Sequence, residues 1–117
     1  MDVGELKINR ETFEGTRIEI MRLGGGIDAH TFDQLDNAIQ NIFDEQCFAI
    51  ILDMSEVEYI SSAGVGTLVS ATHQASQNGG NLICIQVSDR VLEVLRLLGL
   101  VSTLRIVPDM KAALAFF

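Results

Sequence analysis

Residues 50–66 decide the fold: the chain runs Ile50-Ile-Leu-Asp53 and, after a short gap, Tyr59-Ile-Ser-Ser-Ala-Gly-Val-Gly66. The apolar run that ends at Asp53 is rich in β-branched residues and predicts a buried strand. Two serines and two glycines then open a segment with helical periodicity. Ser61 or Ser62 is therefore expected at a helix start, where unpaired backbone N–H groups lie near its hydroxyl group.

Strands and helices are expected to alternate on both sides of this stretch. Strands are predicted at residues 5–9, 16–23, 48–52, 82–85 and 104–107, and helices after Thr31, Ser62, Ser88 and Pro108. Gly24-Gly-Gly26 is expected to end the second strand, and a bulge near Met21 would explain its imperfect alternation. This order predicts an α/β domain with a mainly parallel sheet of about five strands and four helices, one helical layer on each face.

Two of the helices carry end signals of their own. Thr31 precedes Gln34 by three residues, which is the spacing of a capping box. Asn78-Gly79-Gly80 is a helix stop. The helix between Ser62 and this stop is expected to expose one side, with Ala63, Thr67, Ser70 and Gln74 on it, and a partner is expected to dock on this side.

Composition narrows the class of partner. The 117 residues include 16 acidic and 8 basic side chains, a net charge of −8. Such a surface repels phosphate backbones and anionic lipids, which argues against direct binding of nucleic acid or of a membrane. A partner with a basic face would be attracted.

Targeting signals and cysteines point to a cytoplasmic protein. The longest apolar run, residues 48–52, is far shorter than the roughly 20 residues that span a bilayer. The N-terminal Met1-Asp-Val-Gly-Glu has none of the features of a signal peptide. Cys47 and Cys84 lie in apolar strand settings, and we expect buried, reduced thiols there with no disulfide, metal or cofactor.

Four motifs occur in an order that resembles the STAS domain family, named after sulfate transporters and anti-sigma factor antagonists. They are Gly26-Ile-Asp-Ala-His-Thr31, the strand around Asp53, Ser-Ser-Ala-Gly-Val-Gly at residues 61–66, and Asn78-Gly-Gly-Asn-Leu82. The resemblance covers nearly the whole chain, so residues 1–117 are expected to form one STAS-like domain of the stand-alone antagonist type. It implies a mixed sheet with most helices on one side.

The resemblance makes Ser62 the expected site of phosphorylation. In antagonists of this family, the acceptor is the serine two residues before the first glycine of a Gly-x-Gly pair, which corresponds to Ser62. Two departures are present: Ser61 replaces the usual aspartate before the acceptor, and Ala63 replaces the usual serine or threonine after it. Ser61 is therefore an alternative site. From the residues alone, Ser62 would be an ordinary N-cap worth about 1 kcal/mol.

Four other polar residues, Asp28, His30, Asp53 and His73, are candidates for roles near this serine. The resemblance implies that Asp28 lies close to the acceptor and helps to position a partner kinase or its nucleotide metal. Alternatively, Asp28 stabilises its own turn. Asp53 is expected to be a loop or cap residue, and neither His30 nor His73 completes a catalytic triad.

The function implied by the resemblance is partner switching by a protein that is not an enzyme. The unphosphorylated chain would bind a serine kinase that is also an anti-sigma factor and so release the sigma factor. Phosphorylation by that kinase would end the interaction, and a phosphatase would reset it. Two alternatives remain: a STAS subunit of a membrane transport complex, or a ligand-binding sensor whose pocket includes Asp28 and Ser62.

Overall fold

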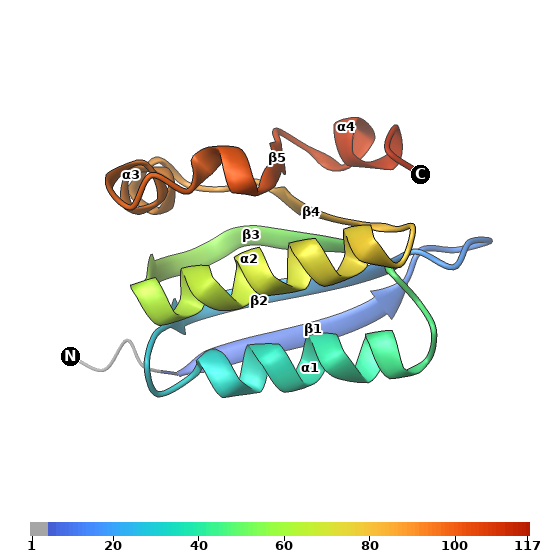
Figure 1. Cartoon of the computed structure of the whole chain (residues 1–117), viewed down its shortest axis with the longest axis horizontal. Coiled ribbons are helices and arrows are strands. Elements are labelled where there is room, and N and C mark those ends of the chain that lie inside the picture. Colours follow the sequence, from blue (N-terminus) through green and yellow to red (C-terminus); the bar gives the residue numbers. More distant parts are fainter. Residues whose placement is uncertain (1–4) are drawn as a thin grey trace.

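A computed structural model describes residues 5–117, and their elements follow the predicted order of strands and helices (Figure 1). They are β1 (Leu6–Thr12), β2 (Glu19–Ile27), α1 (Phe32–Asp44), β3 (Ala49–Ile60), α2 (Ser62–Gln77), β4 (Asn81–Ile85), α3 (Asp89–Leu97), the 3₁₀ helix η1 (Val101–Thr103), β5 (Arg105–Val107) and α4 (Met110–Leu114). The last helix begins after Asp109, which caps it through a hydrogen bond from the Ala112 N–H, and not directly at Pro108.

The sheet is mixed and mostly parallel, as expected. Its strand order is β1-β2-β3-β4-β5, and only the β1–β2 pair is antiparallel. From β3 onward, each new parallel strand pairs with the free edge of the strand before it, so the sheet grows in one direction. Because crossovers between parallel strands are almost always right-handed, the connecting helices α1, α2 and α3 fall on one face. The helical layers are thus unequal, as the family resemblance implies, since among the helices of residues 5–117 α4 alone packs on the other face.

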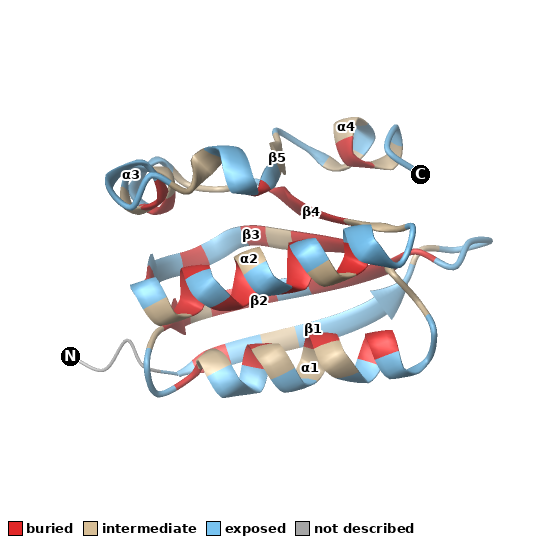
Figure 2. Ribbon diagram, viewed as in Figure 1, coloured by how far each residue is buried: buried red, intermediate tan, exposed pale blue. Residues whose placement is uncertain are grey.

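Alternation along the strands divides the apolar residues between two cores. Figure 2 shows where buried positions lie along the strands and helices. The larger core lies beneath α1, α2 and α3 and includes Ile50, Leu52, Leu82 and Cys84. The smaller core lies beneath α4 and includes Ile51, Ile83, Ile85 and Ala113. Strands covered on both faces are apolar throughout, which explains the unbroken run at residues 48–52.

Two strand boundaries were predicted wrongly. Gly24-Gly-Gly26 does not end β2, because this strand continues to Ile27 and pairs with β3 along its whole length. β3 in turn passes Asp53 and ends at Ile60, with register shifts opposite Arg22–Gly24 and Gly25–Gly26. These bulges let two strands of unequal residue count remain paired. They replace the bulge expected near Met21.

The end of α2 is confirmed. Asn78 follows the last helical turn, and Gly79 has a φ of +79°, a left-handed conformation that favours glycine. At Gly80, a Cβ atom would collide with the carbonyl oxygen of Phe48. This close approach lets the chain turn directly into β4.

Candidate functional site

The serine turn lies where β3 meets α2, and Ser61 is its capping residue. The Ser61 hydroxyl accepts a hydrogen bond from the Gly64 N–H at 3.4 Å, and its own N–H donates to the Ile27 carbonyl at 2.8 Å. Ser61 has extended backbone angles, as an N-cap should. The interpretation of Ser62 as the cap is therefore wrong: α2 begins at Ser62, one residue earlier than expected, so Ser61 occupies the capping position.

Ser62 is the first residue of α2 and is exposed. Its hydroxyl group makes no hydrogen bond to any residue within 5–117. The free N–H groups and the dipole of the helix start favour a negative charge close to this position. Ser62 thus presents an unengaged nucleophile to solvent at a place that tolerates a phosphate group.

The two glycines of the turn have different roles. Gly64 is buried, and a Cβ atom there would lie 2.6 Å from Ile27 Cγ2 and 2.9 Å from Ile60 Cγ1. Gly66 is exposed, and a Cβ atom there would meet nothing within 4 Å. The missing side chain of Gly64 therefore serves internal packing, whereas that of Gly66 leaves the surface of the turn open.

Asp28 lies beside the serine turn, because the residue before it, Ile27, accepts the Ser61 hydrogen bond. Its carboxylate accepts hydrogen bonds from the His30 N–H at 2.8 Å and from the Thr31 hydroxyl at 3.3 Å. These contacts stabilise the turn in which Asp28 itself lies. The buried Thr31 hydroxyl also donates to the Gly26 carbonyl, so it closes this loop and does not form the predicted capping box.

The predicted exposed side of α2 is largely wrong. Thr67 is buried, with its hydroxyl group bonded to the Ala63 carbonyl, and Ala63 is half-buried. Gln74 exchanges hydrogen bonds with Gln40 of α1 at 2.9 and 3.3 Å. This side of α2 therefore faces α1, which packs next to it on the sheet. The exposed residues of α2 are instead Ser62, Gly66, Ser70, His73, Ser76 and Gln77.

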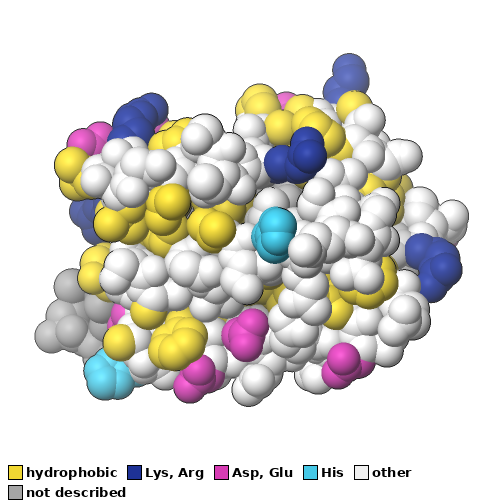
Figure 3. Space-filling view, viewed as in Figure 1, with side chains coloured by type: hydrophobic (Ala, Val, Ile, Leu, Met, Phe, Trp, Pro, Cys, Tyr) yellow, Lys and Arg dark blue, Asp and Glu magenta, His cyan; other side chains and the backbone are white. Residues whose placement is uncertain are grey.

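The exposed strip of α2, defined by those six residues, carries no formal charge. None of the residues from Ser62 to Gln77 is Asp, Glu, Lys or Arg, in a chain with a net charge of −8. Figure 3 shows this face, with acidic and basic side chains lying mainly around the molecule's edges. Depletion of charged side chains is one feature of the central part of protein interfaces.

Comparison with protein families matches the model described as "STAS domain" to residues 7–113. The chain belongs to the STAS domain family. The family expected from the four sequence motifs is therefore confirmed, and so is the fold that it implies.

Similar STAS proteins are antagonists of anti-sigma factors by name. An "Anti-sigma F factor antagonist" of Paenibacillus polymyxa is 32% identical over 99 residues, which cover 81% of this chain and 80% of that protein. An anti-sigma factor antagonist from Mycobacterium paratuberculosis has a TM-score of 0.82 at 22% identity, covering 95% and 92% of the two chains. SpoIIAA of Bacillus in its phosphorylated form has a TM-score of 0.68 at 20% identity, covering 91% and 96%.

Asp53 has a structural position within the STAS fold that the sequence did not indicate. It lies in the middle of β3, where pairing with β4 stops and pairing with β2 continues. Its carboxylate accepts a hydrogen bond from the Ser55 N–H at 3.0 Å and lies 3.8 Å from Arg22. The expectation of a loop or cap residue is therefore wrong, and Asp53 helps β3 to leave β4.

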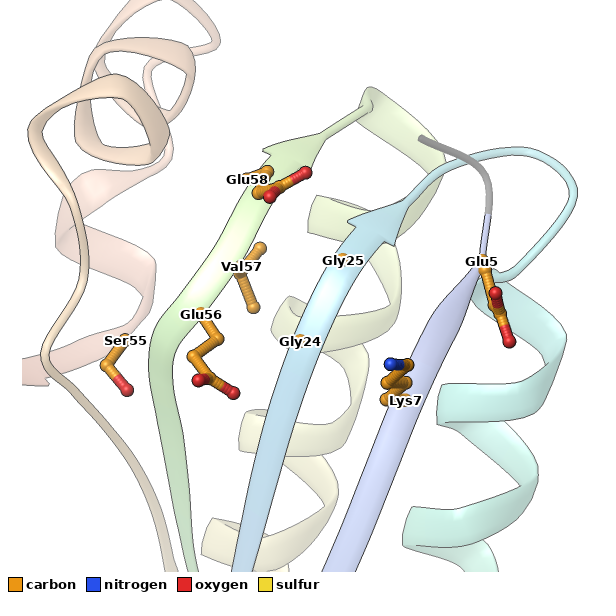
Figure 4. Close-up of a pocket in the computed structure, with 8 residues that line it drawn as sticks. All are labelled: Glu5, Lys7, Gly24, Gly25, Ser55, Glu56, Val57 and Glu58. Carbon is orange, nitrogen blue, oxygen red and sulfur yellow. The ribbon is translucent and has the colours of Figure 1, made fainter. Parts of the chain in front are cut away.

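A groove of about 540 Å³ lies on the sheet face opposite α1 and α2. Figure 4 shows Lys7 on β1 and Glu56 on β3 flanking Gly24, which has no side chain to fill the space between them. Neither Asp28 nor the two serines line this groove. Within residues 5–117 there is no group of three or more His, Cys, Asp or Glu side chains placed to hold a metal ion.

None of the helices in the described part of this STAS domain combines the length and apolar character that crossing a bilayer requires.

Proposed function

We propose that this STAS domain is an anti-sigma factor antagonist that works by partner switching. Its unphosphorylated form binds an anti-sigma factor that is also a serine kinase, and phosphorylation of Ser62 ends the complex. A phosphatase restores the binding form. The observation that carries the proposal is the position of Ser62, exposed and without a hydrogen-bond partner in the described chain, at one end of an uncharged strip.

Relatives support both parts of this proposal. The name of the Paenibacillus polymyxa protein states that it antagonises an anti-sigma factor, and it matches most of this chain. The structural neighbour SpoIIAA has been solved in both phosphorylated and unphosphorylated forms. These relatives make an anti-sigma factor the partner to test first, and we propose that the complex forms in the cytoplasm.

The proposed modification requires only a hydroxyl group from this chain. Ser62 Oγ attacks the γ-phosphorus of ATP held by the kinase, and the bond from that phosphorus to the bridging oxygen breaks. ADP leaves, and a base of the kinase receives the hydroxyl proton. In the reverse reaction a phosphatase directs water at the phosphorus, which releases inorganic phosphate and restores the hydroxyl. The antagonist is a substrate in both steps, so it needs no cofactor of its own.

Charge explains how one phosphate would break the complex. Phosphorylation adds roughly −1.5 to −2 charges at the end of a helix that has none. If the strip lies against the kinase, this charge must be desolvated or must push the partner away. A loss of about 2 kcal/mol, which one well-packed contact can supply, weakens binding roughly thirtyfold.

The docking surface proposed here is the exposed strip, with Ser62, Gly66 and Ser70 nearest the helix start. It replaces the side that contains Thr67 and Gln74, which α1 covers. Asp28 is proposed to border this surface, because its loop is hydrogen-bonded to the serine turn. Its substitution would then weaken kinase binding even when the fold is intact.

The test combines site mapping with binding measurements. Purified chain is incubated with the anti-sigma factor kinase of the same organism and Mg·ATP, and the phosphate is located by mass spectrometry. We expect one phosphate, on Ser62. In titration calorimetry, Ser62→Ala should bind the kinase like the wild type, whereas Ser62→Asp should bind at least tenfold more weakly.

Other outcomes would point elsewhere. A chain that binds the kinase but carries no phosphate on either serine would exclude the switch and favour the role of a permanent subunit, for example in a membrane transport complex. Equal binding by Ser62→Asp and Ser62→Ala would show that the strip is not the docking surface.

A further inference from the structure

Two neighbouring serines stand at the start of α2, and only one of them is free to react. We propose that Ser61 and Gly64 are positioning residues that make Ser62 the sole acceptor of phosphate. This inference rests on the proposed function and names the groups that select the modified site. Neither residue touches ATP; both act by fixing the backbone from which Ser62 projects.

Three groups of Ser61 make hydrogen bonds: its N–H, its carbonyl oxygen and its hydroxyl. Its N–H donates to the Ile27 carbonyl at 2.8 Å, its carbonyl accepts from the Val65 N–H at 2.9 Å, and its hydroxyl accepts from the Gly64 N–H. Its side chain is also only half-exposed. Transfer of phosphate to the Ser61 hydroxyl would have to break the cap and leave the Gly64 N–H without this partner. Ser62 can react without disturbing any of these bonds.

Gly64 lets the first turn of α2 pack closely against Ile27 and Ile60, because it has no side chain. A Cβ atom at this position would lie 2.6 Å from Ile27 Cγ2, 2.8 Å from the Ile27 carbonyl oxygen and 2.9 Å from Ile60 Cγ1. Both isoleucines are fully buried at the ends of β2 and β3, so neither can move away easily. Ile27 therefore holds Ser61 through its carbonyl oxygen and packs against Gly64 with its side chain. Together these two contacts fix the backbone from which Ser62 projects.

Substitutions of Ser61 can distinguish its role as the cap of α2 from a role as a phosphate acceptor. Removing a cap changes the population of an ordered first turn by about fivefold, so Ser61→Ala should lower kcat/KM for phosphorylation of Ser62 by up to that factor. Asparagine caps a helix as well as serine does, yet it has no hydroxyl group to phosphorylate. Ser61→Asn should therefore restore the wild-type rate.

The matched control is Ser88→Ala. Ser88 caps α3 by accepting a hydrogen bond from the Val91 N–H at 3.2 Å, so its loss removes the same kind of bond from another helix. Its stability loss should resemble that of Ser61→Ala, while phosphorylation of Ser62 stays unchanged. Comparing phosphorylation rates of Ser61→Ala and Ser88→Ala therefore shows whether misplacement of Ser62, and not a general loss of stability, slows the reaction.

Gly64→Ala and Gly66→Ala form a second pair that does not need the kinase. Amide hydrogen exchange followed by mass spectrometry should be faster across residues 61–66 in Gly64→Ala. The added methyl group would push the start of α2 away from Ile27 and Ile60. In Gly66→Ala exchange should be unchanged or slower, since the methyl group enters open space and alanine favours a helix.

The deciding experiment measures kcat/KM and maps the phosphate for the wild type, Ser61→Ala, Ser61→Asn, Ser62→Ala and Ser88→Ala with the same kinase and Mg·ATP. The proposal requires no phosphate on Ser61 even in Ser62→Ala, and a rate restored by asparagine. It is overturned by phosphate on Ser61, by equal rates for Ser61→Ala and Ser61→Asn, or by unchanged exchange in Gly64→Ala. A wild-type chain that binds the kinase but is phosphorylated on no serine overturns the proposed function itself, and this inference with it.

Discussion

At the scale of single residues, burial decides chemical reactivity, as the two cysteines show. Burial of the thiol was expected for both cysteines, but only Cys84 is buried; Cys47 is half-buried, with its sulfur 3.0 Å from the Arg17 carbonyl oxygen. Burial raises the pKa of the Cys84 thiol to about 12. The thiolate is the reactive form, so Cys84 is protected twice, by access and by protonation.

Alkylation of the native protein with iodoacetamide at pH 8 should therefore modify Cys47 and leave Cys84 unmodified. In urea both cysteines should react, because the thiol pKa of the unfolded chain returns to its ordinary range. Peptide mapping of the two samples makes the comparison. Equal labelling of both cysteines in the folded protein would contradict the burial of Cys84.

At the scale of elements, an ion-pair cluster joins the β1–β2 hairpin to the end of α1. Arg10 on β1 donates from its two terminal nitrogens to the Glu45 carboxylate at 2.6 and 3.1 Å, and from Nε to Glu19 at 2.5 Å. Thr12 also donates to Glu19, a buried carboxylate. Because α1 has no basic residue in its last turn, Arg10 supplies the positive charge that the helix C-terminus favours.

The same cluster predicts how stability depends on pH. Hydrogen bonding from Arg10 holds the pKa of Glu45 below its ordinary value of 4.5. A carboxyl group with a depressed pKa in the folded state stabilises the fold above its unfolded pKa, and this contribution is lost as the pH falls through the folded pKa. Stability should therefore fall more steeply below about pH 5 in the wild type than in Glu45→Gln.

Urea unfolding midpoints at several pH values between neutral and acidic conditions would measure this difference. Asp44→Asn is the control, because Asp44 is exposed and forms no ion pair with residues 5–117. It should keep the steep dependence of the wild type. Parallel curves for the wild type and Glu45→Gln would show that the Arg10 contact has no effect on stability in solution.

At the scale of the whole molecule, the second face of the sheet depends on the short helix α4. Ala113 is completely buried there against the core that contains Ile51, Ile83 and Ile85. The other three helices cover the opposite face and give these isoleucines no shelter. A helix of only five residues therefore covers the smaller of the two cores, near β4 and β5.

A charge placed under α4 should unfold this side of the molecule. Ala113→Asp buries a carboxylate without a partner and should lower the free energy of unfolding by about 3 kcal/mol. Ala115→Asp is the matched control, since Ala115 is exposed just after the helix and its substitution should cost about 0.5 kcal/mol or less. Urea denaturation followed by circular dichroism compares the two; equal losses would mean that α4 does not cover the core.

What the sequence determined by itself are the features that depend on near neighbours. The alternation of strands and helices, the glycine stop after Asn78 and the helix start after Ser88 all follow from local hydrogen bonding and periodicity, and the structure confirms them. The four motifs also predicted the family. Such signals are local because backbone angles and capping bonds involve residues only a few positions apart.

Only the tertiary structure decided which serine caps α2 and which side of that helix is exposed. Ser61 becomes the cap because β2 extends to Ile27 and offers its carbonyl oxygen there, an arrangement of residues 34 positions apart. α2 has small residues on every side, so its sequence contains little contrast between buried and exposed positions; α1 beside it decides that Thr67 is covered and Ser70 is not. These choices depend on packing between distant segments, which hydrophobic periodicity within one segment does not encode.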